Sequence, residues 1–574
     1  MKEYIKFLKE YVAKYKRKII FASILSLISM LFILLNPIVT RILVDSVFTS
    51  GNFSILNKII FLIVIFTVIN SMIHFIYSYS LNKIFLNLGL DIKKKLFSHI
   101  VKLDLQVTKK MSVGEINFRI FNDSELLKQS FGQIMFGAVF NIILLVFIFV
   151  YMYTISPVMT IFVGAISLIQ SPIIIYFTKR IRAITFERKA VTESTLNRTI
   201  EVINSFHLLK SCNNEECEID RFNENNKKLL DKQLEETNLN LLFTEISNLV
   251  ISCIGFGSIW IGGNLVLGGI ITIGELMSFL LVSNIINTPI SSIVSVITGL
   301  QDALSSTKRI SDVMKLESNM DKKDNDKKVM HNIINEINIK NLNFSYDNGK
   351  EVLKDINLSV NKNTICSIVG RSGAGKTTLC LLIARLFNPT DGKIMVDNID
   401  IKDIDIDSYR KNIGIVLQNS FLFSGSIREN ILLGKSDATE EEVIEAAKAA
   451  NAHDFILELE DGYWTQIGSK ERNLSGGQLQ RIALARIFLQ KPQIVILDEP
   501  TSFIDSESEE LIQNSIERLK EYSTIFIISH KLSTVKKSNK IAVLNNGIIE
   551  AVGTHDELLK NSKKYSDMYK KILA

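Results

Sequence analysis

The stretch "ICSIVGRSGAGKTTLCLLIARLF", residues 365–387, reads as a buried strand, a glycine-rich loop and a helix. That order is the context that a phosphate-binding loop requires. Gly370 and Gly375 let backbone N–H groups wrap phosphate oxygens. Lys376 can reach the terminal phosphates, and Thr377 offers a hydroxyl to Mg²⁺. The other loop residues expected at the nucleotide are Ser372, Gly373 and Thr378. This motif alone does not distinguish among GTPases, kinases and many ATPases.

A second strand, in "PQIVILDEPTS" at 492–502, ends in two acids. The four apolar residues 494–497 indicate a buried strand, and Asp498 and Glu499 follow directly. An aspartate at such a strand end can hold the Mg²⁺ shell, and the next carboxylate can orient or deprotonate the attacking water. Glu499 as a plain surface acid is the weaker interpretation, because it directly follows this strand.

A third stretch, "NLSGGQLQRIALAR" at 473–486, opens an amphipathic helix with two glycines. A helix N-terminus of this kind suits an anion. The expected contacts are Ser475, Gly476, Gly477 and Gln478. Unlike the first loop, this one has no lysine, so its anion needs a cation from elsewhere.

The N-terminal three hundred residues carry the excess of apolar residues that brings the chain to 47% hydrophobic. Six segments come near the roughly 20 residues that a helix needs to cross a bilayer. They lie at about 18–42, 58–81, 134–156, 158–178, 242–264 and 275–300. Six such runs with almost no ionisable residue make buried helices of a large soluble core the poorer explanation.

Loop charge predicts the orientation of these helices. The N-terminal tail and the long connections 82–133 and 179–240 are rich in Lys and Arg, whereas 43–57 and 265–274 contain none. By the positive-inside rule the tail, both long connections and the C-terminal half are cytoplasmic. Helical periodicity in the long connections predicts that helices two to five continue beyond the membrane. The net charge of +6 is accounted for by this topology and gives no reason to expect nucleic acid.

The fold class expected is a multidomain chain, with an all-α six-helix transmembrane domain followed by an α/β P-loop ATPase domain. The predicted bounds are 1–316 for the transmembrane domain, 317–332 for a charged linker and 333–574 for the ATPase domain, where strand and helix signals alternate. The five cysteines form no CxxC pair, so neither a disulfide nor a metal role is expected of them.

Beside these motifs, "LSGGQLQRIALAR" resembles the ATPase domain of an ATP-binding cassette (ABC) transporter. The remaining landmarks follow in the order of that family. Tyr346 matches the aromatic that stacks on adenine, and Gln418 the glutamine that senses Mg²⁺. Asp505, in "TSFID", matches the D-loop, and His530, in "IISHKLS", the switch histidine. The resemblance therefore implies ATP and Mg²⁺ as cofactors, with Glu499, His530 and Gln418 catalytic and Thr377, Gln418 and Asp498 at the metal.

The membrane part resembles the half-transporters of the multidrug, lipid and peptide exporter type (the type IV exporter fold). Weaker traces are "GEINFRIFND", Glu201 and Phe222. In that family two ATPase domains hold ATP between the phosphate loop of one copy and the "LSGGQ" of the other, so a second half-transporter is implied. Because one chain carries the full residue set, a homodimer is favoured and a heterodimer remains open. One departure is "TQIGSKE", 465–471, where Ser469 replaces the usual acid and Glu471 the last glycine.

The substrate is weakly indicated. The apolar segments carry sparse uncharged polar residues and one ionisable side chain, His74, a candidate by its position. The polar residues are Asn70, Tyr77, Tyr79, Asn141, Gln170, Asn284 and Asn287. They favour an amphipathic drug, a lipid or a hydrophobic peptide. Export is expected; an importer of the same fold and a regulatory or channel-like membrane ATPase stay as alternatives. Ile, Lys and Asn usage suggests the cell membrane of a bacterium.

Overall fold

The computed structural model describes residues 2–48, 53–132, 137, 139–316, 328–330, 332–333, 335–346, 349–418, 420–468, 474–501, 505–529 and 531–573. The chain divides into two compact units. The first comprises Met1–Val101 and Ser112–Leu316, and the second comprises Lys102–Met111 and Glu317–Ala574. A short piece of the first predicted cytoplasmic connection thus belongs with the C-terminal unit.

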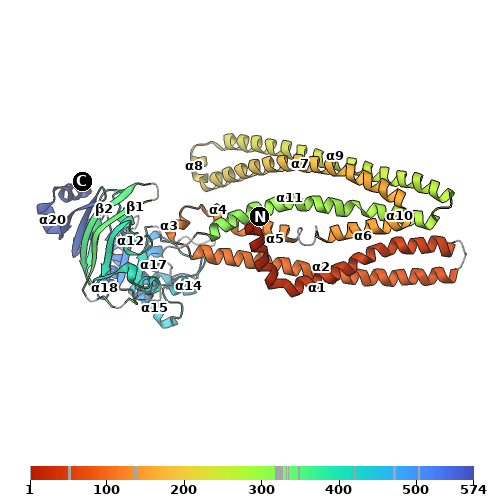
Figure 1. Ribbon diagram of the computed structural model, residues 1–574. Helices are drawn as coiled ribbons and strands as arrows, with labels where there is room; N and C mark the ends of the chain where they lie inside the picture. The colour runs from red at the N-terminus through yellow and green to blue at the C-terminus, as the bar shows by residue number, and fades with distance from the viewer. Residues whose placement is uncertain are drawn as a thin grey trace. The chain divides into compact units, whose positions relative to one another are not determined.

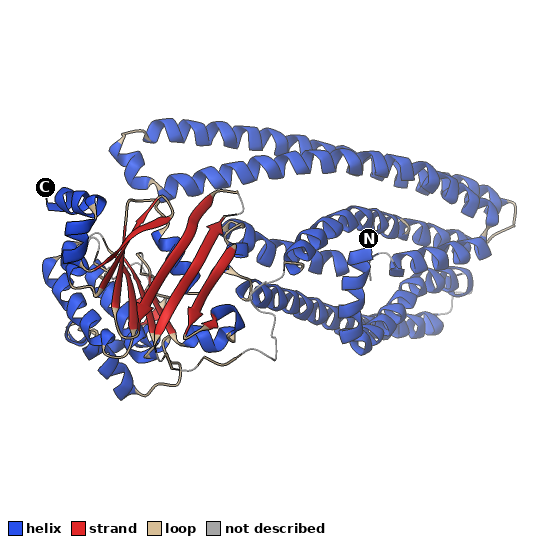
Figure 2. Ribbon diagram, turned by 60° about the vertical axis from the view of Figure 1, so that its left-hand side comes forward, coloured by secondary structure: helices blue, strands red, loops and turns tan. Residues whose placement is uncertain are grey.

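The first unit is helical throughout its described residues (Figure 1). Its long helices are α1 (Lys2–Ile42), α2 (Phe53–Val101), α6 (Val139–Ile155), α7 (Pro157–Asn204), α9 (Glu215–Leu267), α10 (Ile273–Ile285) and α11 (Asn287–Met314). Short helices join them: η1 (Leu43–Phe48), α4 (Val113–Phe118), η2 (Arg119–Asp123), α5 (Ser124–Gly132) and α8 (Phe206–Ser211), of which η1 and η2 are π-helical. α7 and α9 run side by side, and α8 joins them at one end (Figures 1 and 2).

Five described helices are long and apolar enough to cross a membrane by length and composition, and α6 is a shorter apolar helix of 17 residues. α2, α7 and α9 contain 49, 48 and 53 residues, far more than the roughly 20 that a crossing requires. The expected continuation of the apolar helices is therefore present in these three. Residues 134–136 and 138 of the third predicted span lie outside the described part of the chain.

Within the sixth predicted span, 275–300, the regular α-helix is interrupted at a single residue, Ile286, which keeps helical dihedral angles (φ −59°, ψ −34°). α10 ends at Ile285 and α11 begins at Asn287. The cause is Pro289, which has no N–H to donate to the Ile285 carbonyl and whose ring crowds that carbonyl. The break was readable from the sequence.

The second unit contains two main sheets and their covering helices (Figure 2). The six-stranded sheet has the order β12-β11-β3-β10-β9-β6, parallel except for β12, and the four-stranded antiparallel sheet has the order β2-β1-β4-β5. The strands are β1 (Glu336–Ser345), β2 (Glu351–Asn361), β3 (Ile365–Val369), β4 (Asp391–Val396), β5 (Ile399–Asp400), β6 (Ile413–Val416), β7 (Gly425–Ser426), β8 (Gln466–Ile467), β9 (Ile494–Asp498), β10 (Thr524–Ile528), β11 (Lys540–Asn545) and β12 (Ile548–Gly553). The α-helices are α3 (Leu105–Thr108), α12 (Lys376–Ile383), α13 (Ile406–Lys411), α14 (Ile427–Leu432), α15 (Glu440–Ala449), α16 (His453–Leu457), α17 (Gly476–Gln490), α18 (Ser506–Lys520), α19 (Leu532–Lys536), α20 (His555–Asn561) and α21 (Lys563–Leu573).

The central strands are buried on both faces because helices or the second sheet cover each side. On β9, Ile494 and Ile496 face the core that contains α12 and the antiparallel sheet, whereas Val495 and Leu497 face the core built by α15, α17 and α18. This alternation explains why the strand reads as one unbroken apolar run.

The end of the predicted linker is held by the second unit. The Lys328 N–H donates to the Asp403 carbonyl at 3.0 Å, and Met330 is buried in the core beneath α12. Residues 317–327 lie outside the described part of the chain.

Candidate active site

The phosphate-binding loop lies between β3 and α12, where the sequence predicted it. Gly375 is the N-cap of α12 with φ +102°, and Gly373 has φ +78°, both in the left-handed region that favours glycine. A Cβ at Gly370 would lie 2.1 Å from the carbonyl oxygen of Leu544. The backbone here can take its close turn only with these glycines.

The Lys376 ammonium lies inside this loop and donates to the carbonyl oxygens of Gly370 at 2.8 Å and Arg371 at 3.1 Å. Burial lowers the pKa of Lys376 below its ordinary value, while the charges of Glu499 and Asp498 act in the opposite direction. A half-buried cation held by neutral carbonyls gains when anionic oxygens replace them. Lys376 is therefore placed to receive phosphate oxygens.

Four predicted residues meet at the carboxyl ends of the parallel strands. The Thr377 hydroxyl, at the start of α12, donates to the Asp498 carboxylate at 2.9 Å. The Gln418 Nε2, which follows β6, donates to the Glu499 carboxylate at 2.9 Å. β9, which ends at Asp498 and leads directly into Glu499, lies beside β6 in the sheet, and this neighbourhood brings Gln418 to Glu499. The edge formed by the carboxyl ends is where ligands bind in open α/β sheets.

The oxygens gathered here suit magnesium. Thr377, Asp498 and Gln418 offer a hydroxyl, a carboxylate and an amide oxygen, which are the hard ligands that Mg²⁺ takes while keeping several waters. Among the described residues no group of three or more His, Cys, Asp and Glu forms a metal site. The arrangement thus fits Mg²⁺ bound jointly with a phosphate rather than in a protein cage.

Glu499 has an unusual backbone. Its φ is +50°, a left-handed conformation that costs a non-glycine residue of the order of 1 kcal/mol or more. Its N–H donates to the Ile528 carbonyl on β10 at 2.9 Å, which holds the conformation. Such strain concentrates at functional sites, and here it turns the carboxylate toward Gln418.

Tyr346 lies beside the loop in an aromatic cluster. Its hydroxyl is 3.0 Å from the Thr378 hydroxyl, and its ring meets Phe344 and Phe387 edge-on, with centroids 5.0 and 6.0 Å away. The Lys109 ammonium lies 5.3 Å from the centroid of Phe387. A contact therefore runs from the segment Lys102–Met111 to the predicted adenine residue. The sequence reasoning missed Lys109 and Phe387, because neither belongs to a motif.

The predicted anion-binding helix α17 begins as expected. Ser475 is its N-cap, with its hydroxyl accepting from the Gln478 N–H at 3.2 Å and its own N–H donating to the Gln478 side chain at 2.9 Å. The first turn of α17 is exposed at Ser475 and Gly476, whereas Gly477 is buried.

Of the remaining predicted site residues, some are described by the structure and others are not. Asp505 is the N-cap of α18, and hydrogen bonds from the backbone and side chain of Ser508 lower its pKa. His530 lies outside the described residues, as do Ser469 and Glu471 of the atypical segment. In that segment Thr465 is buried, and Gly468 has φ +91° with Ser424 against it. The two retained residues therefore support the pairing of β8 with β7.

In the helical unit, several of the predicted polar residues form hydrogen bonds with other residues of the same unit. Ser29 donates to Asn70 at 3.0 Å, and the amides of Asn141 and Asn284 donate to backbone carbonyls one turn earlier. His74 is exposed, with its ring edge-on to Tyr77 at 5.9 Å. The side chain of Asn287 lies outside the described part. These contacts leave few polar groups to specify a substrate.

A phosphate loop, an acid pair and a second anion helix with an exposed N-cap, joined to a unit of long apolar helices, define a membrane ATPase. Family models match at residues 19–290, an ABC transporter transmembrane region, and at residues 353–502, an ABC transporter. The chain belongs to the ABC transporter family, as a half-transporter of the exporter type in which ATP hydrolysis is coupled to transport.

Similar proteins extend over the whole chain. A multidrug export ATP-binding/permease protein of Bacillus subtilis is 32% identical over 580 residues, covering 99% of this chain and 98% of the relative. A protein of the same description from Staphylococcus aureus is 33% identical, covering 99% of both. A bacterial Atm1-family ABC exporter with ATP bound has the same fold, with a TM-score of 0.82 at 24% identity over 98% of this chain and 100% of that one.

Proposed function

We propose that two copies of this chain form a homodimer that exports an amphipathic or hydrophobic compound across a bacterial cell membrane. The observation that carries the proposal is the meeting of Thr377, Asp498, Gln418 and Glu499 at one strand edge. The sequence of one chain also contains every other residue predicted for the ATP site. A complete set in each copy makes two equivalent sites, which is the expectation for a homodimer.

Each residue has a proposed role in hydrolysis. Tyr346 stacks on adenine and Lys376 binds the terminal phosphates. Thr377, Asp498 and Gln418 hold Mg²⁺, which supplies charge to the phosphates when bound. Glu499 accepts the proton of the attacking water or orients it, and the strained backbone presents its carboxylate for that task. Gln418 leaves Glu499 when it turns to the metal shell, and His530 and Asp505 complete the site.

The second copy supplies the anion helix. The N-terminus of α17, exposed at Ser475 and Gly476 and followed by the buried Gly477, faces in the proposed dimer the γ-phosphate held by the partner, where the helix dipole stabilises negative charge. ATP binding then favours the closed pair and hydrolysis releases it, so ATP shifts the equilibrium between two membrane conformations. The lysine absent from the "LSGGQ" stretch is Lys376 of the other copy.

The proposed domains are 1–316 in the membrane and 333–574 for ATP hydrolysis, with 317–332 between them and both termini cytoplasmic. The substrate class rests on the apolar helices, on polar groups already bonded within the protein, and on the multidrug export named for the relatives. Export is favoured over import because relatives matched along the whole chain carry export names.

The test is ATPase activity of the purified protein in lipid, with a lipophilic cationic dye, a fluorescent phospholipid and a hydrophobic peptide added in turn. We expect one of the three to stimulate hydrolysis at least about twofold, because a substrate that binds one conformation better shifts the cycle. The same compounds added to E499Q must give no stimulation. Stimulation by a sugar or a small ion instead of these compounds would contradict the proposed substrate class.

A further inference from the structure

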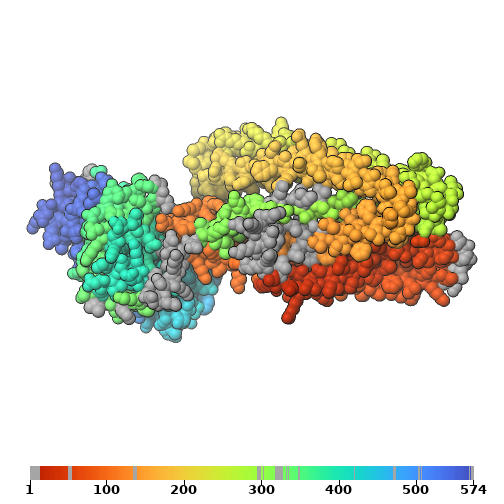
Figure 3. All heavy atoms as spheres, in the orientation of Figure 1, coloured from red at the N-terminus to blue at the C-terminus, as the bar shows by residue number. Residues whose placement is uncertain are grey.

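The distal parts of α7 and α9 pack with little apolar burial. Beyond residue 180, the described side chains of α7 that are buried are Ile184 and Thr195, and α9 buries none before Ile254. Large apolar side chains there are exposed: Phe186, Leu196, Ile200, Ile203 and Phe222. On the face drawn in Figure 3 no other segment covers these two helices. Something other than a hydrophobic core must hold the pair together.

Ion pairs connect the two helices where apolar packing is thin. Arg188 donates to Glu236 at 2.7 Å, and Lys232 pairs with Glu187 at 2.5 Å. Both lie some distance from the α8 end. Nearest to α8 a third pair joins Arg198 on α7 to Glu218 on α9.

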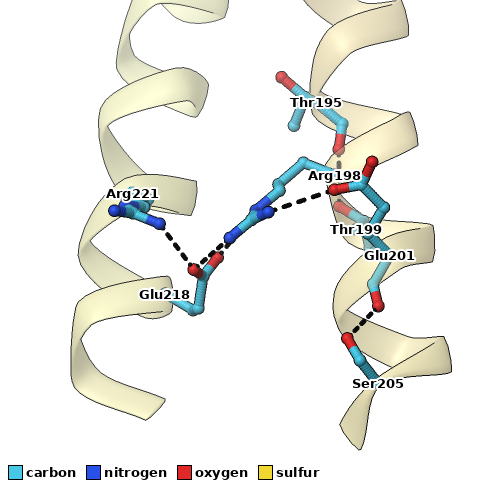
Figure 4. A network of polar contacts seen from close by, with 7 residues as sticks. All are labelled: Thr195, Arg198, Thr199, Glu201, Ser205, Glu218 and Arg221. Carbon is cyan, nitrogen blue, oxygen red and sulfur yellow. Dashed lines mark hydrogen bonds and ion pairs between the residues drawn. The ribbon is translucent and has the colours of Figure 1, made fainter. Parts of the chain in front are cut away.

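The Arg198–Glu218 pair is the best-formed of the three. Arg198 contacts both carboxylate oxygens, with its Nε donating at 3.1 Å (Figure 4). Glu218 also accepts from Arg221, one turn along α9, at 2.9 Å, and its side chain is 10% exposed. Arg198 reaches Glu201 as well, at 3.2 Å. A bidentate pair with a shielded carboxylate is stronger and more specific in geometry than an ordinary surface pair.

The Arg198–Glu218 pair joins the end of α7 to the start of α9, the two helix ends that α8 connects. Glu201 lies in the last turn of α7, whose C-cap is Ser205, and Glu218 lies in the first turn of α9. α8 and its turns, which include Asn213 with φ +49°, fill the short connection between them. On the far side Lys210 of α8 donates to Glu215 at 2.8 Å. The position of α8 therefore depends on whether the ends of α7 and α9 stay together.

We propose that Arg198 and Glu218 form an ionic clamp that positions α8, and that this clamp sets how efficiently ATP hydrolysis is converted into transport. The inference rests on the proposed function and adds one step to it: α8 lies in the predicted cytoplasmic connection 179–240, and we infer that it passes movement between the ATPase and the membrane part. Neither residue is among the proposed ATP-site residues. Both are positioning residues, and their loss leaves the hydrolytic machinery intact while loosening the element that carries the movement.

The chain offers its own reporter. Cys212 is the C-cap of α8 and is exposed, as are Cys217 and Cys253, whereas Cys366 and Cys380 are buried. In a C217S/C253S background a nitroxide spin label on Cys212 reports the mobility of α8 directly. Measured on full-length protein in lipid, it is independent of any transport assay.

Five variants separate a clamp between helices from a local effect. R198Q and E218Q break the bond between α7 and α9. R221Q is the matched control, because it removes a partner of the same carboxylate within one helix. R198E/E201R/E218R/R221E inverts all four charges and keeps every pairing. R198K serves as a milder version where E218Q fails to fold.

We expect R198Q to raise the mobility of the label and to lower transport per ATP hydrolysed about fivefold, the upper range for a partly exposed ion pair. Basal ATPase stays within about twofold, since no site residue is touched. R221Q stays near wild type, and the inverted network regains the wild-type label spectrum and coupling. Raising KCl from 0.1 to about 1 M shortens the screening length from about 10 to about 3 Å and mobilises the label in wild type but not in R198Q.

Unchanged label mobility in R198Q would overturn the clamp, and so would equal effects of R198Q and R221Q. A mobile label with unchanged transport per ATP would overturn the claim that the clamp sets coupling. Absence of transport in the wild type would contradict the proposed function alone, because the Cys212 spectra still report whether the clamp holds α8.

Discussion

Gln418 donates a hydrogen bond to the Glu499 carboxylate at 2.9 Å, across residues 81 positions apart in the chain. The two follow neighbouring parallel strands, β6 and β9, so the sheet brings them together. The contact ties the proposed base to the residue that must turn toward Mg²⁺. In the proposed mechanism this hydrogen bond would be exchanged for contacts at the metal when nucleotide and Mg²⁺ bind.

Replacing Glu499 with Gln removes the base and keeps a polar side chain beside Gln418. We expect E499Q to lower ATPase activity by at least about 100-fold, the lower range for loss of general-base catalysis. ATP binding persists, so nucleotide stays trapped in the protein. The control is E510Q, an exposed acid on α18. ATP turnover by E499Q at the rate of E510Q would refute the assignment.

Removing Mg²⁺ with EDTA should abolish hydrolysis, and T377V should raise the free Mg²⁺ needed for half-maximal activity. The reason is that the Thr377 hydroxyl bonds to Asp498 at the proposed metal position and offers one of the few protein ligands. The measurement is ATPase activity against free Mg²⁺. An unchanged Mg²⁺ requirement in T377V would place the metal elsewhere.

Lys109 lies over Phe387, whose ring is stacked on Phe344 at 5.7 Å and edge-on to Tyr346. K109A should weaken ATP binding about twofold to fivefold, as expected for an exposed cation–π contact of about 0.5–1 kcal/mol. Titration with fluorescent ATP measures it, and K102A is the control from the same segment. Because coupling is reciprocal, K109A should have no further effect in a Y346A background. Additive losses would show that the contact does not reach the adenine residue.

Arg309 forms a bidentate pair with Asp123, which is fully buried, whereas the Arg309 side chain is 40% exposed. D123N leaves the partly exposed guanidinium without its charged partner. Loss of a hydrogen-bonded charged partner costs about 1–3 kcal/mol. A thermal melt in detergent should show a clearly lower Tm for D123N than for D220N, an exposed control on α9. Equal melting temperatures would contradict this role.

The exposed N-terminus of α17 predicts a contact between copies. In a background without Cys212, Cys217 and Cys253, the S372C/S475C variant should form a covalent dimer on oxidation with ATP, because each helix meets the partner's phosphate loop. Non-reducing electrophoresis distinguishes the covalent dimer from the single chain, whose mass is 64.9 kDa. Cross-linking within single chains only would exclude the shared site.

Local sequence was enough to locate those elements whose residues are contiguous in one strand, loop or helix start. The glycine loop, the acids after β9 and the cap of α17 all lie where their motifs predicted. Pairings across the fold could not be read in the same way. Asp123 and Arg309 are 186 residues apart, and neither lies in a motif that names the other.

The same holds for contacts made by ordinary side chains. Lys109 and Phe387 gain their roles only because α3 lies against the core beneath Tyr346. The interruption before α11 differs from these long-range contacts, since Pro289, three residues after Ile286, is enough to predict it. Sequence patterns thus predict the elements and propose the site residues, while tertiary contacts determine how these residues connect to the rest of their unit.

The most direct test is ATP-dependent accumulation of the stimulating compound in inside-out membrane vesicles containing wild type, E499Q or E510Q. We expect accumulation with Mg²⁺ and ATP in wild type and E510Q, and at most a few per cent of it in E499Q, because only hydrolysis resets the transporter. Accumulation by E499Q equal to that of wild type would contradict ATP-driven export by this site.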